Sequence, residues 1–103
     1  MKHPSHELPI RLKVEMAQAV ASVIHSLHYG EPSIIGFLLE DLKAHALFLD
    51  DFIQQDVLMF AEQVQFQMVY DPWHSVTMNV EQAADRLVED LGFCPPPYFF
   101  RIV

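Results

Sequence analysis

Apolar residues recur at helical spacing in four segments of this chain, and Gly and Pro separate the segments. A helix turns 100° per residue, so apolar residues three or four positions apart form one face that packs into a core. We expect an all-α fold, a compact four-helix bundle followed by an extended Pro-rich tail over 93–103. The pattern predicts helices over about 9–29, 33–49, 51–70 and 79–91.

The length of 103 residues fits one domain with one hydrophobic core. A folded chain of about this size buries roughly 60–70% of its unfolded surface, which is sufficient without disulfides or metal ions. Apolar residues make up 51% of the chain and charged residues 19%, a composition that argues against intrinsic disorder. We therefore expect residues 1–103 to form a single domain.

Local signals mark the ends of the predicted helices. Pro9 suits a first helical turn, and Gly30 suits the left-handed residue that follows a helix. Asn79 stands three residues before Gln82, which predicts a capping box with Asn79 as the N-cap of the last helix. Gly92 predicts the end of that helix.

Two stretches also alternate between apolar and polar residues, from Leu8 to Met16 and from Val64 to Met68. Alternation with a period of two is typical of a strand. The alternative is therefore an α+β fold with an N-terminal strand. We favour helices because each stretch continues into a long segment with helical spacing and no turn residues.

The first three segments carry more apolar residues than one core face requires. In the third segment, Glu62 is the only charge between Val57 and Tyr70. Few charges beside large apolar side chains characterise the core of a protein interface. We therefore expect an interface that draws on these candidates: Phe37, Phe48, Phe52, Met59, Phe66, Tyr70, Trp73, Tyr98, Phe99 and Phe100.

Trp73 and the C-terminal aromatic residues have more than one reading. Trp73 follows Asp71-Pro72 in a turn, where it either covers the end of the core, which we favour, or serves recognition. The tail docks on its own domain, exchanges with a neighbour or binds a partner. Its Pro95-Pro96-Pro97-Tyr98 sequence resembles the PPxY ligand of WW domains, whereas its dense apolar flanks favour burial.

The charge of the chain restricts its partners. Asp and Glu number 14 against 6 Lys and Arg, a net charge of −8, and the basic residues are scattered singly. Nucleic acids and anionic membranes would be repelled, so we expect neither as a partner. A basic protein partner is favoured by the same charge.

Two features bear on location. The uninterrupted apolar runs are far shorter than the about 20 residues that a membrane-spanning helix needs, so we expect no membrane association. Cys94 is the single cysteine, which excludes an internal disulfide and suits a reducing compartment. We expect a cytoplasmic protein.

Signals for catalysis and metal binding are weak. The chain has no GxSxG, HExxH or CxxC motif and no Gly-rich phosphate loop. His25 and His28 share a helical spacing, as do Asp41 and His45, but a metal site needs three or four converging ligands. We expect the carboxylates of the acidic group Glu40, Asp41, Asp50, Asp51 and Asp56 to be solvated or to cap helices. We therefore predict no catalytic, cofactor-binding or metal-ligating residue.

Three classes of function follow from these observations. The leading hypothesis is a small, acidic, non-enzymatic protein-interaction or regulatory module that forms a homodimer. The alternative is a helical module that binds a small apolar ligand between its helices. The third is a metal-dependent enzyme that uses the His and Asp residues above.

Overall fold

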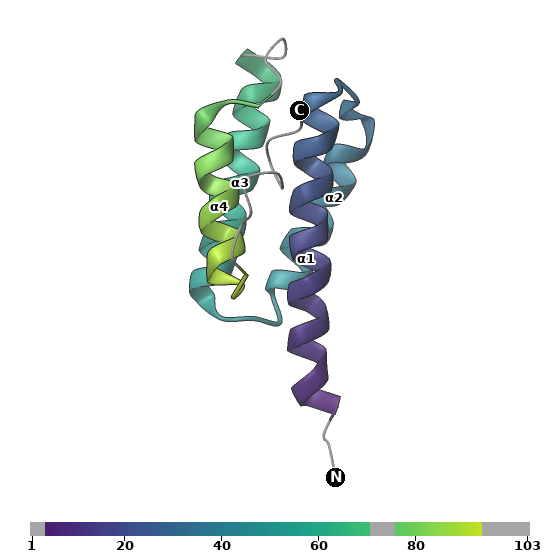
Figure 1. The fold of residues 1–103 in the computed structure, drawn as a ribbon, viewed down its shortest axis with the longest axis vertical. Helices are drawn as coiled ribbons and strands as arrows, with labels where there is room; N and C mark the ends of the chain where they lie inside the picture. Colours follow the sequence, from purple (N-terminus) through teal and green to yellow (C-terminus); the bar gives the residue numbers. More distant parts are fainter. Residues whose placement is uncertain (1–3, 71–75, 94–103) are drawn as a thin grey trace.

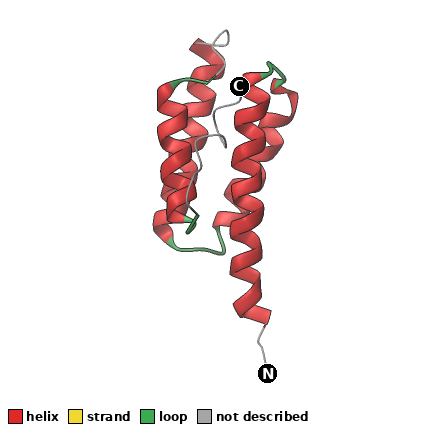
Figure 2. Ribbon diagram, viewed as in Figure 1, coloured by secondary structure: helices red, strands yellow, loops and turns green. Residues whose placement is uncertain are grey.

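The computed structural model of the chain describes residues 4–70 and 76–93, with the backbone alone for residues 4–9. Helices α1 (Pro4–His28), α2 (Ile35–Ala46), α3 (Asp51–Tyr70) and α4 (Met78–Asp90) form the predicted all-α four-helix fold, with a 3-10 turn η1 (Pro32–Ile34) before α2. No strand occurs in the described residues (Figure 2). The α+β alternative is wrong, because both alternating stretches lie inside helices.

The helices pack as two antiparallel hairpins. α1 and α2 form one hairpin, α3 and α4 form the other, and α2 packs against α3 (Figure 1). The N-terminal end of α1 extends past the other helices (Figure 1). Each helix therefore keeps at least one flank outside the bundle.

One apolar core joins the four helices. Buried apolar side chains from all four helices form it, but Ile34, which shares the core spacing of the second predicted helix, is 48% exposed. On α1, Ile10 and Val14 are exposed, whereas Met16 and Val23 are buried. The largest fully buried apolar side chains are Phe60, Met16, Ile24, Ile35, Leu42, Ile53 and Leu87.

Glycines end two of the helices as predicted. Gly30 has a φ of 69° and Gly92 a φ of 97°, both in the left-handed region that favours glycine. After α1, the amide of Glu31 donates to the carbonyl of Ser26 at 2.8 Å; after α4, the amide of Phe93 donates to the carbonyl of Val88 at 3.1 Å. These 6→1 bonds define Schellman motifs, which satisfy carbonyl groups at the helix ends.

Three helix ends differ from the prediction. α1 begins at Pro4 and continues through Pro9, which costs one backbone hydrogen bond because proline lacks an N–H group. α2 ends at Ala46, and residues 47–49 tighten into i→i+3 hydrogen bonds before α3. The N-cap of α4 is Thr77, not Asn79, and its hydroxyl accepts from the amide of Val80 at 3.4 Å.

No helix in the described part of the chain has the length and apolar character to cross a membrane.

Candidate protein-interaction surface

An apolar stripe runs along one flank of α3. It consists of Phe52, Met59, Phe66 and Tyr70, which we call the α3 stripe; these side chains are between 51% and 68% exposed. Their spacing of seven, seven and four residues keeps them on one line of the helix. The rings of Phe66 and Tyr70 lie in contact, with centroids 4.6 Å apart. The opposite face of α3 fills the core, so a single copy of the bundle leaves this stripe in water.

The C-terminal half of the α3 stripe carries little charge. Glu62 is the only ionisable side chain between the middle of α3 and Tyr70, and the neighbouring Gln65 is neutral and exposed. Exposure of this flank to water is therefore unfavourable, and it offers few charges to a charged partner. Apolar side chains with a neutral surround match the composition of an interface core.

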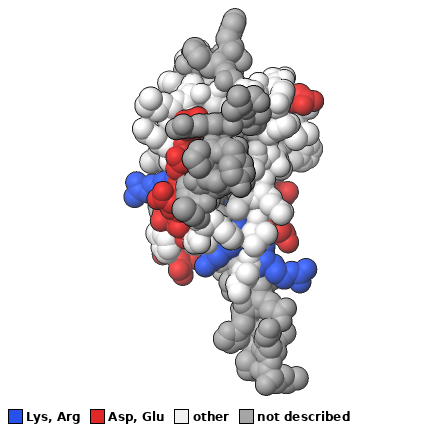
Figure 3. Space-filling model, in the orientation of Figure 1, with Lys and Arg blue, Asp and Glu red and all other residues white. Residues whose placement is uncertain are grey.

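The stripe borders the acidic surface of α4. Asp56 lies one turn from both Phe52 and Met59 on α3, and its Oδ1 lies 3.6 Å from Nε of Arg86 on α4. Acidic side chains gather over α4 in the space-filling view (Figure 3). Asp56 itself is only 9% exposed, so the expectation that it is solvated is wrong: packing of α4 against α3 covers it.

The environment of Asp56 favours its protonated form. Burial is the main cause that raises the pKa of this carboxyl from 3.8 to about 7, followed by the hydrogen bond and negative charge of Asp90. The charge of Arg86 acts in the opposite direction but is smaller. The helical periodicity of α3 offered no signal for this, because the partners of Asp56 lie some thirty residues later in the chain.

Two further candidates, Phe37 on α2 and Phe48 in the turns that follow α2, are also exposed. Phe37 and Phe48 are 77% and 72% exposed. Phe37 borders a shallow groove with Gly36 and Glu40 of α2 and with Gln65 of α3. One residue corresponds to 100° of rotation, so this groove lies about 100° around α3 from Phe66. The candidates on α2 and α3 therefore face different directions.

The remaining candidates are Trp73, Tyr98, Phe99 and Phe100, which lie outside the described residues. Sequence reasoning missed several further exposed apolar side chains. They are Leu47, Leu58, Val69 and Met78.

The three histidines whose side chains the structure describes, His25, His28 and His45, do not converge on a metal site. His45 Nδ1 lies 2.6 Å from the backbone carbonyl of Asp41, and its Nε2 lies 3.3 Å from Oε1 of Glu15. His45 thus contacts the backbone of Asp41 and links α2 to α1 through Glu15. The rings of His25 and His28 both contact Tyr29. Among the described residues, no group of three His, Cys, Asp or Glu residues has the geometry to hold a metal ion.

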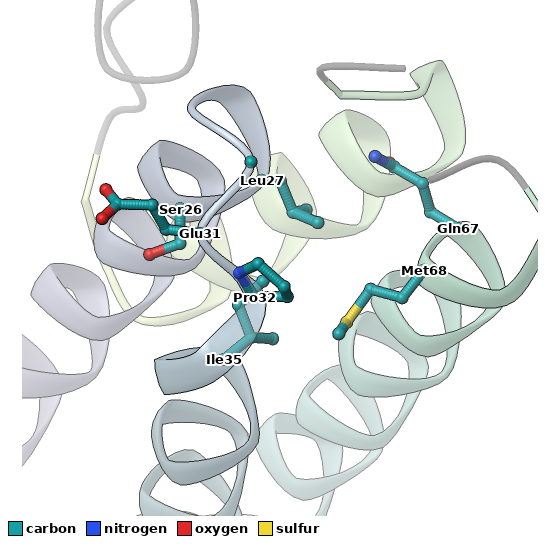
Figure 4. A pocket seen from close by; sticks show the side chains of 8 residues that line it. Ser26, Leu27, Glu31, Pro32, Ile35, Gln67 and Met68 are labelled. Atoms are coloured by element: carbon teal, nitrogen blue, oxygen red, sulfur yellow. The ribbon is translucent and has the colours of Figure 1, made fainter. Parts of the chain in front are cut away.

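A pocket of about 270 Å³ lies where the C-terminal end of α1 meets η1 and the last turn of α3. Figure 4 shows Leu27, Pro32, Ile35 and Met68 bordering the space, with Gln67 at one side. Its lining is mainly apolar. The described part of the chain thus combines an apolar stripe on α3, an acidic α4 and a small apolar pocket.

No protein-family model matches this chain, and no curated protein or solved structure shows significant similarity to it. The class that the structure defines is therefore architectural: an all-α, antiparallel four-helix bundle.

Proposed function

We propose that this protein is a small, acidic, non-enzymatic interaction module that forms a homodimer through the α3 stripe. The observation that carries the proposal is the stripe itself, four large apolar side chains that remain about half exposed on one nearly uncharged flank. Surface apolar residues that cluster in this way mark interaction sites more often than scattered ones do.

The exposed area of the stripe suits the centre of an interface. An aromatic residue offers about 150–250 Å² of surface, so four half-exposed side chains present on the order of 400 Å². A standard interface buries about 800 Å² per partner, with a polar rim around an apolar core. The stripe supplies about half of that area, and the flanking neutral residues of α3 supply a rim.

A second copy of this chain is the occupant that the chemistry favours. A two-fold interface joins the same patch on both copies, so the patch must complement itself. A neutral apolar stripe meets that condition, whereas the acidic face of α4 would repel its own copy. That acidic face is better suited to a basic protein, which would bind beside the dimer interface.

The test is the molar mass in solution, measured by light scattering after size-exclusion chromatography. We expect a dimer for the wild type and a folded monomer for the double variant Met59→Glu, Phe66→Glu. Each lost apolar side chain is worth about 1.5–3 kcal/mol, so the dissociation constant should rise by at least about 100-fold.

The matched control, called the α2 variant, is Phe37→Glu, Phe48→Glu, which places the same charges at two exposed aromatic positions on α2 and just after it. It should remain dimeric. A monomeric wild type, or a dimer that the α2 variant disrupts and the α3 variant does not, would refute the proposal. Circular dichroism verifies that each variant is folded, and Met59→Ala, Phe66→Ala replaces the Glu variant if that one unfolds.

The pocket supports a second candidate function, the binding of a small apolar ligand. Its lining by Leu27, Pro32, Ile35 and Met68 favours an apolar group. Its volume of about 270 Å³ lies just below the range of about 300–1,000 Å³ for pockets that take drug-sized ligands, so it suits a fragment or a single side chain. Native mass spectrometry tests this alternative, because a bound ligand adds a fixed mass.

A cytoplasmic location completes the proposal. Its support is the sequence, in which the single Cys94 leaves no partner for an internal disulfide.

A further inference from the structure

A buried carboxyl group lies between α3 and α4 near the end of the bundle where α4 ends. Asp56 is 9% exposed, and Oδ2 of its side chain is buried without a hydrogen-bond partner. Its Oδ1 faces Nε of Arg86 at 3.6 Å, but the Arg86 side chain is 77% exposed. A long contact to a solvated guanidinium compensates only part of the cost of a buried negative charge.

Asp90, the last residue of α4, is the second carboxyl group at this position. Two neighbouring carboxylates repel each other, so one of them is stabilised in the protonated form. A proton on Oδ2 of Asp56 turns an unsatisfied acceptor into a donor, and the Asp90 carboxylate is the acceptor beside it. Protonation therefore replaces a repulsive contact with a hydrogen bond between two helices.

We propose that Asp56 and Asp90 share one proton and form a pH-sensitive latch that holds the last turn of α4 against α3. The latch is closed when the pair is protonated. When the proton leaves, a buried carboxylate that Arg86 compensates only in part faces Asp90 across the helix interface, and the end of α4 loosens.

Among the described residues, the charged groups that act on Asp56 come from α4. Arg86 and Asp90 are the charged residues that act on it. On α3, the positions one turn away are Phe52, Ile53, Met59 and Phe60, none of which titrates. On the other two helices, Lys43 of α2 pairs with Glu40, and Glu15 of α1 pairs with His45.

The direction of the pH effect follows from the raised pKa of Asp56. Between pH 3.8 and about 7, the folded protein retains a proton that the unfolded chain has already released. The latch therefore stabilises the fold most below this window, and stability falls as the pH rises through it. Above about pH 7, Asp56 is ionised in both the folded and the unfolded protein, and the stabilisation that its proton contributes is completely lost.

The test compares the stability of the wild type and of Asp56→Asn by denaturant unfolding from about pH 5 to about pH 8, the window in which the proton is released. An amide at position 56 resembles the protonated carboxyl group, since its N–H₂ donates to Asp90 and its oxygen faces Arg86. We expect the wild-type midpoint to fall with rising pH and the midpoint of the variant to stay nearly constant. At the alkaline end the variant should be the more stable protein.

Glu62→Gln, an exposed neutralisation on the same helix, is the matched control and should keep the wild-type pH slope. A variant Asp56→Asn with that same slope would overturn the latch. If Asp56→Asn fails to fold, carbon-13 NMR of the wild-type Asp56 carboxyl decides: titration near neutral pH supports the latch, and titration near pH 4 contradicts it. All variants are compared at the same protein concentration, so that a difference in dimerisation is not mistaken for a difference in the pH dependence of stability. The dimer itself is measured separately by molar mass.

Discussion

The backbone amide of Thr77 donates a 2.9 Å hydrogen bond to Oε1 of Gln67, a side chain buried in the last turn of α3. The bond joins two helices across residues 71–75, because Thr77 is also the N-cap of α4. A polar side chain is tolerated in an apolar core when its groups are hydrogen-bonded. Gln67 thus fixes where α4 starts relative to α3.

Replacing Gln67 by Leu should destabilise the protein although it adds an apolar side chain to the core. The amide of Thr77 would lose its acceptor, and a lost partner of this kind costs about 1–3 kcal/mol. Denaturant unfolding at fixed pH measures the loss. Gln65→Leu, an exposed position two residues earlier, is the control and should change the free energy of unfolding by less than about 0.5 kcal/mol. Equal effects at both positions would contradict this role of Gln67.

The N-cap of α4 distinguishes the structure from the sequence prediction. Thr77→Ala removes the hydroxyl that accepts from Val80 and should lower the free energy of unfolding by about 1 kcal/mol. Asn79→Ala should cost less than about 0.5 kcal/mol, because Asn79 is exposed within the first turn rather than at the cap. Thermal or denaturant unfolding of the two variants measures the difference, and the reverse order would restore Asn79 as the cap.

Salt should leave the proposed dimer intact. Raising the ionic strength from about 0.1 M to about 1 M shortens the Debye length from about 10 Å to about 3 Å, which weakens contacts between exposed charges. The α3 stripe is nearly uncharged, so the dimer fraction measured by light scattering should stay constant or increase. Complexes with a basic partner on α4 should dissociate under the same conditions. A wild-type dimer that separates in high salt would argue for an electrostatic interface instead.

Much of the architecture was predictable from residues close together in the chain. Helical spacing identified all four helices, and Gly30 and Gly92 marked the ends of α1 and α4, because left-handed residues with Schellman bonds depend on a few neighbouring positions. The errors at Pro9 and Asn79 are shifts of a helix start, where several residues satisfy the same local rule. Thr77 is the cap because Gln67 holds its amide, and that contact spans ten residues.

The candidate site, like the fold, was predictable from the sequence only in part. Sequence spacing placed the residues of the α3 stripe on one flank, since seven residues are nearly two helical turns. It grouped Phe37 and Phe48 with them, although these residues lie on α2 and just after it and face another direction. Which flank of a helix faces outward depends on where its neighbours pack, and spacing within one helix carries no information about that.

Periodicity along the chain thus determined that this protein is helical, where its helices lie and that they carry surplus apolar surface, because each property arises within a few turns. The tertiary structure alone decided that the α3 stripe faces water and that Asp56 does not. Asp56 is an ordinary helix-surface carboxylate until α4 covers it, since burial and the nearness of Asp90 are properties of two helices in contact.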